Sequence, residues 1–195
     1  MDWEGLYQTQ DTGWDRGDVS TGLQQWLVLK KLSVERDKRV LIPGCGRGYE
    51  VVELAKLGFD VTGLDIAPTA IADLHALLKN NDVQAEAVCG DLFTYQTAQP
   101  FDVVYEQTCL CALPLEKRGA YEEKLFEWLK PDGRLLLSMM QTGENSGPPF
   151  HCDWSDMCDL FSEKRWVWQK DAPFIVPHWR DSPRFELGFV LHKKA

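Results

Sequence analysis

The chain has 195 residues, of which 30 are Asp or Glu and 21 are Lys or Arg, so its formal net charge is −9 at pH 7. This length is sufficient for one domain with a substantial core that needs no disulfide or metal. The acidic balance disfavours nucleic acid as a partner, because it repels a phosphate backbone. The start of the sequence lacks a signal-peptide pattern, and no apolar run approaches about 20 residues. We expect a single cytoplasmic domain over residues 1–195, with no membrane partner.

The six cysteines and four histidines raise the question of a metal site. No two cysteines form a C-x-x-C pair, and no two histidines have the close spacing of a metal-binding pair. The spacing therefore argues against zinc, and we expect no bound metal. Cys45, Cys89, Cys109 and Cys111 lie in apolar stretches, which predicts small buried residues in a reducing compartment.

Strand and helix patterns alternate along most of the chain. Short runs rich in Val, Ile and Leu are typical of strands covered on both faces. They are residues 39–43, 60–66, 85–90, 101–106 and 133–140. Helical periodicity marks residues 48–58, 67–82 and 115–133. The apolar spacing predicts that Leu57 and Ala120 face the core from the first and third of these helices.

This alternation predicts a doubly wound α/β fold, a mostly parallel seven-stranded sheet with helices on both faces. Residues 164–171 and 184–194 are two further strand patterns with no obvious helix between them. They should pair as an antiparallel hairpin at one edge. A dinucleotide-binding fold would instead continue with a second βαβ unit.

Three glycines, Gly44, Gly46 and Gly48, follow the first predicted strand directly. Glycine permits positive φ and removes Cβ atoms that would collide with a ligand passing over the backbone. In a parallel sheet, ligands lie beyond the carboxyl ends of the strands, where this turn is placed. The glycines indicate either a ligand-binding turn or a purely structural one, since glycine also permits close packing.

Two acidic residues at the ends of the next two strands favour a ligand-binding turn over a purely structural one. Asp65 stands 65 − 44 = 21 residues after the first glycine, a spacing suited to a carboxylate that binds ribose hydroxyls. Asp91 precedes Leu92 and Phe93, so it can accept from an exocyclic amine while its neighbours contact a purine. The alternative for Asp91 is a turn cap. Together these positions suit a nucleoside.

The glycine spacing discriminates between cofactors. A pyrophosphate cofactor requires G-x-G-x-x-G and places its charge at the helix N-terminus. Here the sequence is G-C-G-R-G-Y-E, and Glu50 in the first helical turn would oppose an anion. S-adenosylmethionine has no phosphate and a zwitterionic amino-acid end. The pattern, with the antiparallel C-terminal strands, therefore favours a methyltransferase over an NAD-dependent oxidoreductase.

Seven stretches together resemble the thiopurine S-methyltransferase family of class I S-adenosylmethionine-dependent methyltransferases, including its thiol and halide methyltransferase branch. They are W-E-G-L-Y (3–7), T-G-W-D (12–15), L-I-P-G-C-G-R-G (41–48), G-L-D-I (63–66), G-D-L-F (90–93), F-D-V-V-Y-E-Q-T-C-L-C-A-L (101–113) and G-P-P-F (147–150). Pro43 before the glycines and the G-P-P-F turn are the most particular to this family. The resemblance is continuous from about Trp3 to Phe150.

The resemblance implies a set of cofactor-binding residues. They are Trp3, Tyr7, Trp14, Gly44, Gly46, Asp65, Ile66, Asp91, Leu92, Glu106 and Gln107. By this resemblance residues 1–22 are a lid whose aromatic side chains fold over the cofactor, and residues 23–195 are the α/β core. The glycines would line the methionine end, Asp65 the ribose, and Asp91 with Leu92 the adenine. The alternative for the aromatic residues is ordinary packing beneath a helix.

The sequence departs from the family at three positions. Tyr7 stands where a second Trp is frequent, Gly13 where a Pro is frequent, and Gln107 where the thiopurine-acting members have an Arg. The loss of that Arg weakens the case for a thiopurine as the natural substrate.

Methyl transfer to a soft nucleophile needs positioning and water exclusion more than acid–base chemistry, because a thiol with a pKa near 8.5 is already partly ionised at neutral pH. Glu106 and Tyr105 are the candidate bases. The segment containing Cys109 and Leu110 should form one wall of the acceptor pocket, opposite Phe150. Such an apolar wall predicts a compact acceptor and a broad range: a thiol, thiopurine, hydrosulfide, thiocyanate or halide.

Two residues of the third helix, Arg118 and Tyr121, are candidates for shaping that pocket, although a helical Arg is more often a surface residue. A monomer acting on a small molecule is the expectation. Another small-molecule or protein acceptor, or a non-catalytic cofactor-binding module, remains the alternative.

Overall fold

The computed structural model describes residues 1–177 and 183–194. The chain divides into two compact units, residues 1–96 and residues 97–195, and each is described by itself. Both combine parallel strands with helices, and the second adds antiparallel strands at the C-terminal end. The predicted α/β fold class is thus confirmed. Among the described residues, no helix has the length and apolar character needed to cross a bilayer.

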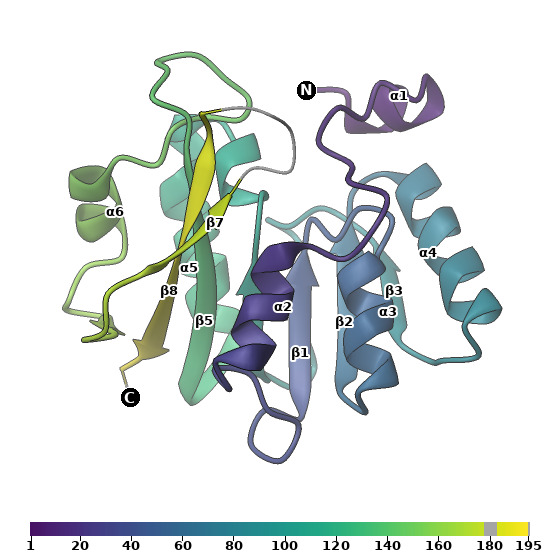
Figure 1. Ribbon diagram of the computed structural model, residues 1–195, viewed down its shortest axis with the longest axis horizontal. Coiled ribbons are helices and arrows are strands. Elements are labelled where there is room, and N and C mark those ends of the chain that lie inside the picture. The colour runs from purple at the N-terminus through teal and green to yellow at the C-terminus, as the bar shows by residue number, and fades with distance from the viewer. Residues whose placement is uncertain (178–182, 195) are drawn as a thin grey trace. The chain divides into compact units, whose positions relative to one another are not determined.

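The first unit is a parallel three-stranded layer with helices packed on it (Figure 1). Its elements are α1 (Trp3–Gln8), α2 (Thr21–Val28), β1 (Arg39–Pro43), α3 (Tyr49–Lys56), β2 (Asp60–Asp65), α4 (Pro68–Asn80) and β3 (Glu86–Cys89). The strand order is β3-β2-β1. Helices α3 and α4 contact β2 and each other, and α1 contacts α4. The carboxyl ends of all three strands therefore lie at one edge.

Helices α1 and α2 were not predicted from apolar periodicity, because they are short and begin at polar caps. The Asp2 carboxylate accepts from the Gly5 N–H at 3.0 Å, and the Ser20 hydroxyl accepts from the Leu23 N–H at 3.1 Å. Such caps satisfy N–H groups that have no partner in the first helical turn.

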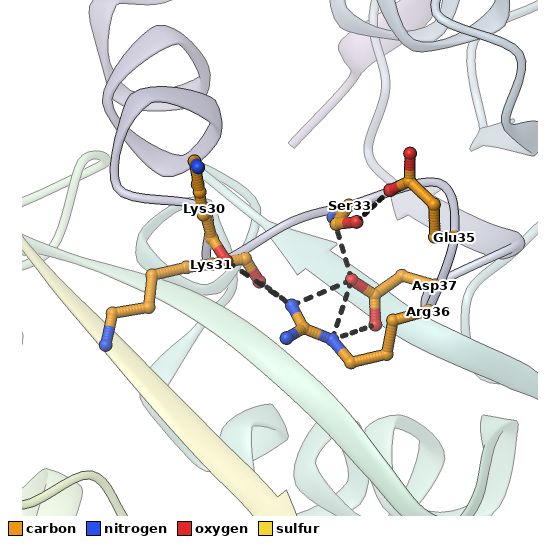
Figure 2. Close-up of polar contacts among 6 residues, drawn as sticks. All are labelled: Lys30, Lys31, Ser33, Glu35, Arg36 and Asp37. Atoms are coloured by element: carbon orange, nitrogen blue, oxygen red, sulfur yellow. Dashed lines mark hydrogen bonds and ion pairs between the residues drawn. The ribbon is translucent and has the colours of Figure 1, made fainter.

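The connection from α2 to β1 is closed by a polar cluster, residues 30–37, that Figure 2 shows. The Arg36 guanidinium donates to the carbonyls of Lys30 and Lys31, just after α2, and to the Asp37 carboxylate. Asp37 also accepts from the Ser33 N–H at 2.9 Å. The N–H groups of Lys30 and Lys31 in turn donate to carbonyls in the last turn of α2. The cluster therefore ties the segment before β1 to the end of α2.

The second unit contains two parallel strands extended by antiparallel ones. Its elements are β4 (Phe101–Glu106), the 3₁₀ helices η1 (Leu110–Ala112) and η2 (Leu115–Lys117), α5 (Arg118–Trp128), β5 (Leu129–Gln141), α6 (Trp154–Leu160), β6 (Trp166–Trp168), β7 (Phe174–Pro177) and β8 (Phe185–Lys193). Strand β4 pairs with β5 in parallel, and β5 pairs with β8 antiparallel. Helix α5 packs on both β4 and β5.

The C-terminal strands are more complex than the predicted hairpin. Strands β6 and β8 pair antiparallel as expected, but β7 lies between them in sequence and also pairs with β8. The described residues thus contain eight strands where seven were predicted. The additional strand was missed because it has only four residues and ends in Pro177, which lacks a donor for the sheet.

Three predicted burial positions are wrong. Leu57 is 44% exposed because α3 ends at Lys56, and Ala120 is exposed because α5 buries Tyr121 and Leu125 instead. Cys89 is exposed because β3 is the outer strand of the first unit. Cys45, Cys109 and Cys111 are buried, as predicted.

The glycine before α3 provides a test of the turn. Gly48 has φ +82°, and a Cβ there would clash with the Leu74 side chain. We expect Gly48→Ala to lower the free energy of unfolding by about 1–3 kcal/mol, from backbone strain and overpacking. Urea unfolding measures this change.

The matched control is Gly119→Ala in the first turn of α5, where a Cβ meets no atom of the described residues within 4 Å. There we expect a gain of about 0.4–1 kcal/mol, since alanine has less backbone freedom than glycine to lose on folding. Equal effects of the two changes would contradict the prediction.

Candidate functional site

The turn after β1 has the backbone that its glycines predict. Gly44, Gly46 and Gly48 have φ values of +62°, +54° and +82°, a region that favours glycine over other residues. The turn leads directly into α3 and is held to β2, because the Cys45 N–H donates to the Leu64 carbonyl at 3.1 Å.

Asp65, the last residue of β2, ties this turn to the following one. Its Oδ2 accepts from the Gly46 N–H at 2.8 Å, and its Oδ1 accepts from the Ala67 N–H at 2.9 Å. Asp65 is 8% exposed, and this burial raises the pKa of its carboxyl despite the two backbone donors. Each carboxylate oxygen has a second lone pair, so the group retains acceptor capacity for a ligand.

The three predicted lid aromatics lie together. The Trp14 ring makes edge contacts with Trp3 and Tyr7, at centroid distances of 5.3 and 5.8 Å. The Tyr7 hydroxyl covers the glycine turn, because a Cβ built on Gly46 would lie 2.8 Å from it. Burial and the nearby Asp65 charge raise the pKa of Tyr7, which therefore carries a neutral hydroxyl at pH 7.

Polar contacts that were not predicted from the sequence join this aromatic segment to the rest of the first unit. The Glu4 carboxylate accepts from the Thr69 N–H at 3.0 Å and from its hydroxyl at 2.7 Å, at the first turn of α4. Arg47, from the glycine turn, donates to Asp15 at 2.6 Å and also pairs with Asp73. The sequence carries no local signal for these pairs, since each joins residues 26 to 65 positions apart.

The predicted adenine residues lie at the ends of β2 and β3. The sheet register pairs Asp65 with Cys89, so the two strands end level with each other. Ile66 is 50% exposed, and Leu92 is partly buried. Asp91 is exposed, and its Oδ1 accepts from the Phe93 N–H at 2.7 Å, which is the turn cap considered as its alternative.

In the second unit, Glu106 ends β4 and is fully buried. Its Oε1 accepts from the Leu110 N–H at 2.6 Å, whereas its Oε2 is buried and has no hydrogen-bond partner among the described residues. Burial, and secondarily the neighbouring Glu186 charge, raise the pKa of Glu106 to about 8. A buried carboxyl with a pKa in this range is a candidate general acid or base.

Tyr105 and Gln107, on either side of Glu106, belong to one hydrogen-bond chain. The Tyr105 hydroxyl donates to the Gln107 Oε1 at 2.5 Å, and the Gln107 Nε2 donates to the Glu186 Oε2 at 2.9 Å. Tyr105 and Glu186 are each 1% exposed. Glu186 was not singled out from the sequence, because it lies in the C-terminal part that the resemblance did not align.

The three predicted acceptor-pocket residues lie in this unit as well. Cys109 and Leu110 are buried, and Phe150 is partly exposed after the G-P-P-F turn. The Phe150 N–H donates to the Cys111 carbonyl at 2.7 Å, so the turn is held against η1.

The expectation of a surface position for Arg118 is wrong. Arg118 is 6% exposed and donates to the His151 carbonyl at 3.2 Å and to the Cys152 Sγ at 3.8 Å. Tyr121, one helical turn later, is fully buried. Both point inward because the buried face of α5 contains residues 118, 121, 122, 125 and 128. The guanidinium also lowers the pKa of Glu106, partly opposing the effect of burial.

Comparisons with known proteins agree on one family. The model of the thiopurine S-methyltransferase family matches residues 1–181. The chain is 32% identical over 157 residues to thiocyanate methyltransferase 1 of Arabidopsis thaliana, covering 78% of this chain and 67% of that protein. It is 30% identical over 195 residues to a thiopurine S-methyltransferase of Vibrio cholerae serotype O1 (strain M66-2), covering 90% of this chain and 87% of that protein.

Solved structures support the fold. The 1,6-didemethyltoxoflavin-N1-methyltransferase of Burkholderia thailandensis, with bound S-adenosylhomocysteine, superposes with a TM-score of 0.75 at 18% identity, covering 100% of this chain and 86% of that one. Magnesium protoporphyrin IX methyltransferase of Synechocystis PCC 6803, with bound S-adenosylmethionine, superposes with a TM-score of 0.70 at 18% identity, covering 98% of this chain and 80% of that one. From the family model, the relatives and the shared fold, we conclude that this chain belongs to the thiopurine S-methyltransferase family and is an S-adenosylmethionine-dependent methyltransferase.

Proposed function

We propose that the chain methylates the sulfur of a small soft nucleophile, such as a thiol, thiopurine, hydrosulfide or thiocyanate, or methylates a halide. The observation that carries this proposal is the composition of the Glu106 surroundings, which combine buried apolar and thiol side chains with one carboxylate oxygen that has no partner among the residues described. The names of the relatives, thiocyanate and thiopurine methyltransferases, support it. A compact apolar site favours a polarisable acceptor over a large polar one.

For the cofactor, we propose the predicted residues of the first unit. The bare backbone of Gly44 and Gly46 admits the methionine end, and Asp65 accepts from the ribose hydroxyls. The half-exposed Ile66 and its neighbours Asp91 and Leu92 receive the adenine. The Tyr7 hydroxyl over Gly46 supports a lid role for residues 1–22, because it covers the same turn.

The reaction is an in-line displacement at the sulfonium methyl group. The acceptor sulfur forms a bond to the methyl carbon, the carbon–sulfonium bond breaks, and its electron pair remains on the sulfur of S-adenosylhomocysteine. The chain supplies positioning and exclusion of water. A thiol must also lose its proton, whereas thiocyanate and halides carry none.

We assign the proton acceptor to Glu106 rather than to Tyr105. In the part of the chain that the structure describes, the Glu106 Oε2 has no hydrogen-bond partner. The pKa of the Glu106 carboxyl, about 8, is close to that of a thiol. The Tyr105 hydroxyl already donates to Gln107. Gln107 and Glu106 thus remain proposed contacts of the acceptor and of the cofactor's amino-acid end, with Cys109, Leu110 and Phe150 as the pocket wall.

We further propose that the chain works as a monomer in the cytoplasm, as one domain over residues 1–195, on small molecules and not on nucleic acid. The net charge of −9 and the six free cysteines support this proposal.

The cofactor assignment is tested with Asp65→Asn, which removes the charge and retains one acceptor oxygen. We expect the Kd of S-adenosylmethionine to rise about 10- to 150-fold, since a hydrogen bond to a charged group contributes about 1.5–3 kcal/mol. Calorimetric titration measures the Kd. Asp60→Asn, in the exposed first residue of the same strand, is the matched control and should bind as the wild type does. If Asp65→Asn bound S-adenosylmethionine with the Kd of the wild type, Asp65 would not be a cofactor-binding residue.

The acceptor assignment is tested by following S-adenosylhomocysteine formation with iodide, thiocyanate, hydrosulfide, small thiols and a thiopurine. We expect turnover with several of them, because apolar walls discriminate weakly between similar acceptors. Cofactor binding without turnover of any member would refute the small-nucleophile proposal and favour a protein acceptor or a binding module.

The proposed base is tested with Glu106→Gln. We expect kcat for a small thiol to fall about 100-fold or more, while kcat for thiocyanate changes little because thiocyanate has no proton to lose. Equal losses with both acceptors would indicate that Glu106 acts only through the structure.

Glu106 also makes folding stability depend on pH. Its folded pKa of about 8 lies above the ordinary value of 4.5, so its contribution to stability is complete below about pH 4.5 and is lost as the pH rises through about 8. The free energy of unfolding of the wild type should therefore fall over that pH range, whereas that of Glu106→Gln lacks this contribution. We expect the free energy of unfolding of Glu106→Gln minus that of the wild type to increase as the pH rises. Urea unfolding at a series of pH values measures it, and a difference independent of pH would contradict the raised pKa.

A further inference from the structure

Residues 1–22, the proposed lid, are joined to the rest of the first unit near both ends. Near the end of the lid, the Ser20 N–H donates to the Glu50 carboxylate in the first turn of α3 at 2.9 Å, and Ser20 is 2% exposed. Near its start, the Glu4 carboxylate accepts from the backbone and side chain of Thr69 in the first turn of α4. Opening of the lid between these ends therefore depends on what holds its middle part.

Arg47, from the glycine turn, holds the middle of the lid. Its guanidinium donates to the Asp15 carboxylate at 2.6 Å and also pairs with Asp73 in α4. The guanidinium carbon lies 5.5 Å from the centroid of the Tyr7 ring, which permits a cation–π contact. The side chains of Arg47 and Asp15 are only 23% and 16% exposed. Salt therefore screens this pair less than an ion pair in open solvent.

The lid covers the glycine turn through Tyr7. Apart from its chain neighbours, the atom of the described residues that a Cβ on Gly46 would meet is the Tyr7 hydroxyl, at 2.8 Å. The Trp14 indole N–H donates to the same hydroxyl at 3.5 Å, and Trp14 directly precedes Asp15 in the chain. A ligand that passes over Gly46 needs the space that this hydroxyl occupies. The lid must therefore move before a ligand reaches the turn.

We propose that Arg47 is a positioning residue that latches the lid over the glycine turn, and that the breaking of its pair with Asp15 sets how fast the cofactor enters and leaves. The proposal rests on the proposed function, in which the methionine end of S-adenosylmethionine lies over Gly44 and Gly46. Arg47 directly follows Gly46. The turn that we assign to the cofactor thus also carries the residue that retains its cover.

A latch and a binding contact differ in their kinetics. If the cofactor enters and leaves through the open lid, a weaker latch raises the association and dissociation rate constants by similar factors, and the Kd changes little. Loss of a side chain that contacts the cofactor acts mainly on the dissociation rate constant, and the Kd rises with it. The two rate constants therefore distinguish the two roles.

The experiment compares Asp15→Asn with the wild type, because the amide removes the charge and retains one acceptor oxygen. Stopped-flow tryptophan fluorescence measures both rate constants for S-adenosylmethionine, since Trp3 and Trp14 lie in the lid. We expect both rate constants to rise about fivefold, the upper range for a single ion pair, and the Kd to change less than about twofold.

Trypsin digestion of the protein without cofactor gives a second measurement of the latch. Arg16 is the only lysine or arginine in residues 1–22, so cleavage after it reports opening of the lid. Mass spectrometry identifies the fragment 1–16. We expect this cleavage to be about fivefold faster in Asp15→Asn, because cleavage follows the population of the open form. Thermal unfolding shows whether the variant is folded.

Two further variants isolate the pair. Asp60→Asn is the matched control: Asp60 accepts from Arg39 at 3.1 Å, in the first residue of β2, and its loss should leave both rate constants and the cleavage at Arg16 unchanged. Arg47→Gln removes the other partner. Adding Asp15→Asn to Arg47→Gln should change the rate constants by less than about twofold, because the pair is already broken.

The possible outcomes separate this inference from the cofactor assignment. If Asp65→Asn weakens binding but Asp15→Asn leaves the rate constants and the cleavage unchanged, the cofactor assignment stands and the latch is refuted. A raised Kd with an unchanged association rate constant in Asp15→Asn also refutes the latch, because Asp15 then acts as a binding contact. If Asp65→Asn binds S-adenosylmethionine as the wild type does, the cofactor does not lie over this turn and both proposals fail. Faster entry, exit and cleavage in Asp15→Asn, with weaker binding in Asp65→Asn, support both.

Discussion

A carboxylate buried at the end of a parallel strand must find hydrogen-bond donors, and the turns on which the proposed chemistry depends are organised around this requirement. Asp65 ends β2 and is satisfied by the N–H groups of Gly46 and Ala67. Glu106 ends β4 and accepts from the Leu110 N–H. In both units a backbone turn therefore wraps around an acidic side chain, and the N–H groups of the turn become oriented toward it. Parallel strands supply this geometry because their ends leave backbone groups that no neighbouring strand pairs.

The two carboxylates differ in how completely they are satisfied. Both oxygens of Asp65 have a backbone donor, so in this structure the side chain chiefly holds two turns together. Glu106 is fully buried, and one of its oxygens has no hydrogen-bond partner within residues 1–177 and 183–194. An unsatisfied buried acceptor is costly and therefore uncommon in native proteins. Its retention is easier to understand at a site where a substrate supplies the missing donor. A thiol S–H is such a donor.

The parallel part of the fold could be predicted from the sequence, because its strands are continuous apolar runs and its helices have clear apolar stripes. The bounds of β1 and β4 agree with the predicted residues 39–43 and 101–106. The glycine turn could also be predicted, since backbone with positive φ favours glycine and the three glycines are visible in the sequence. Helices α1 and α2 were not, because each is short and depends on a cap rather than on periodicity.

The side-chain pairs that complete the candidate site could not be predicted from the sequence, for a different reason. Glu4 and Thr69, or Gln107 and Glu186, are ordinary polar residues 65 and 79 positions apart, and nothing local marks them as partners. Arg118 was misjudged on similar grounds: a helical arginine is usually solvated, and only the packing of α5 on β4 and β5 turns it inward. Sequence patterns indicate which backbone is buried, whereas tertiary packing decides which polar groups are buried with it.

The position of Glu186 shows how a buried polar side chain is accommodated inside the sheet of the second unit. Strand β8 has β5 along one edge and shares its other edge between β6 and β7, so it is internal to the sheet of the second unit. A glutamate in an internal strand carries a desolvation cost that an apolar residue would avoid. That cost is offset here by the Gln107 amide, which donates to Glu186 at 2.9 Å and whose oxygen accepts from the Tyr105 hydroxyl. A buried hydrogen-bond chain therefore joins β8 to the residues on either side of Glu106. The strand β4 places the carboxyl of Glu106 at its end, and the antiparallel strand β8 supplies a partner for the polar side chains that are buried next to it.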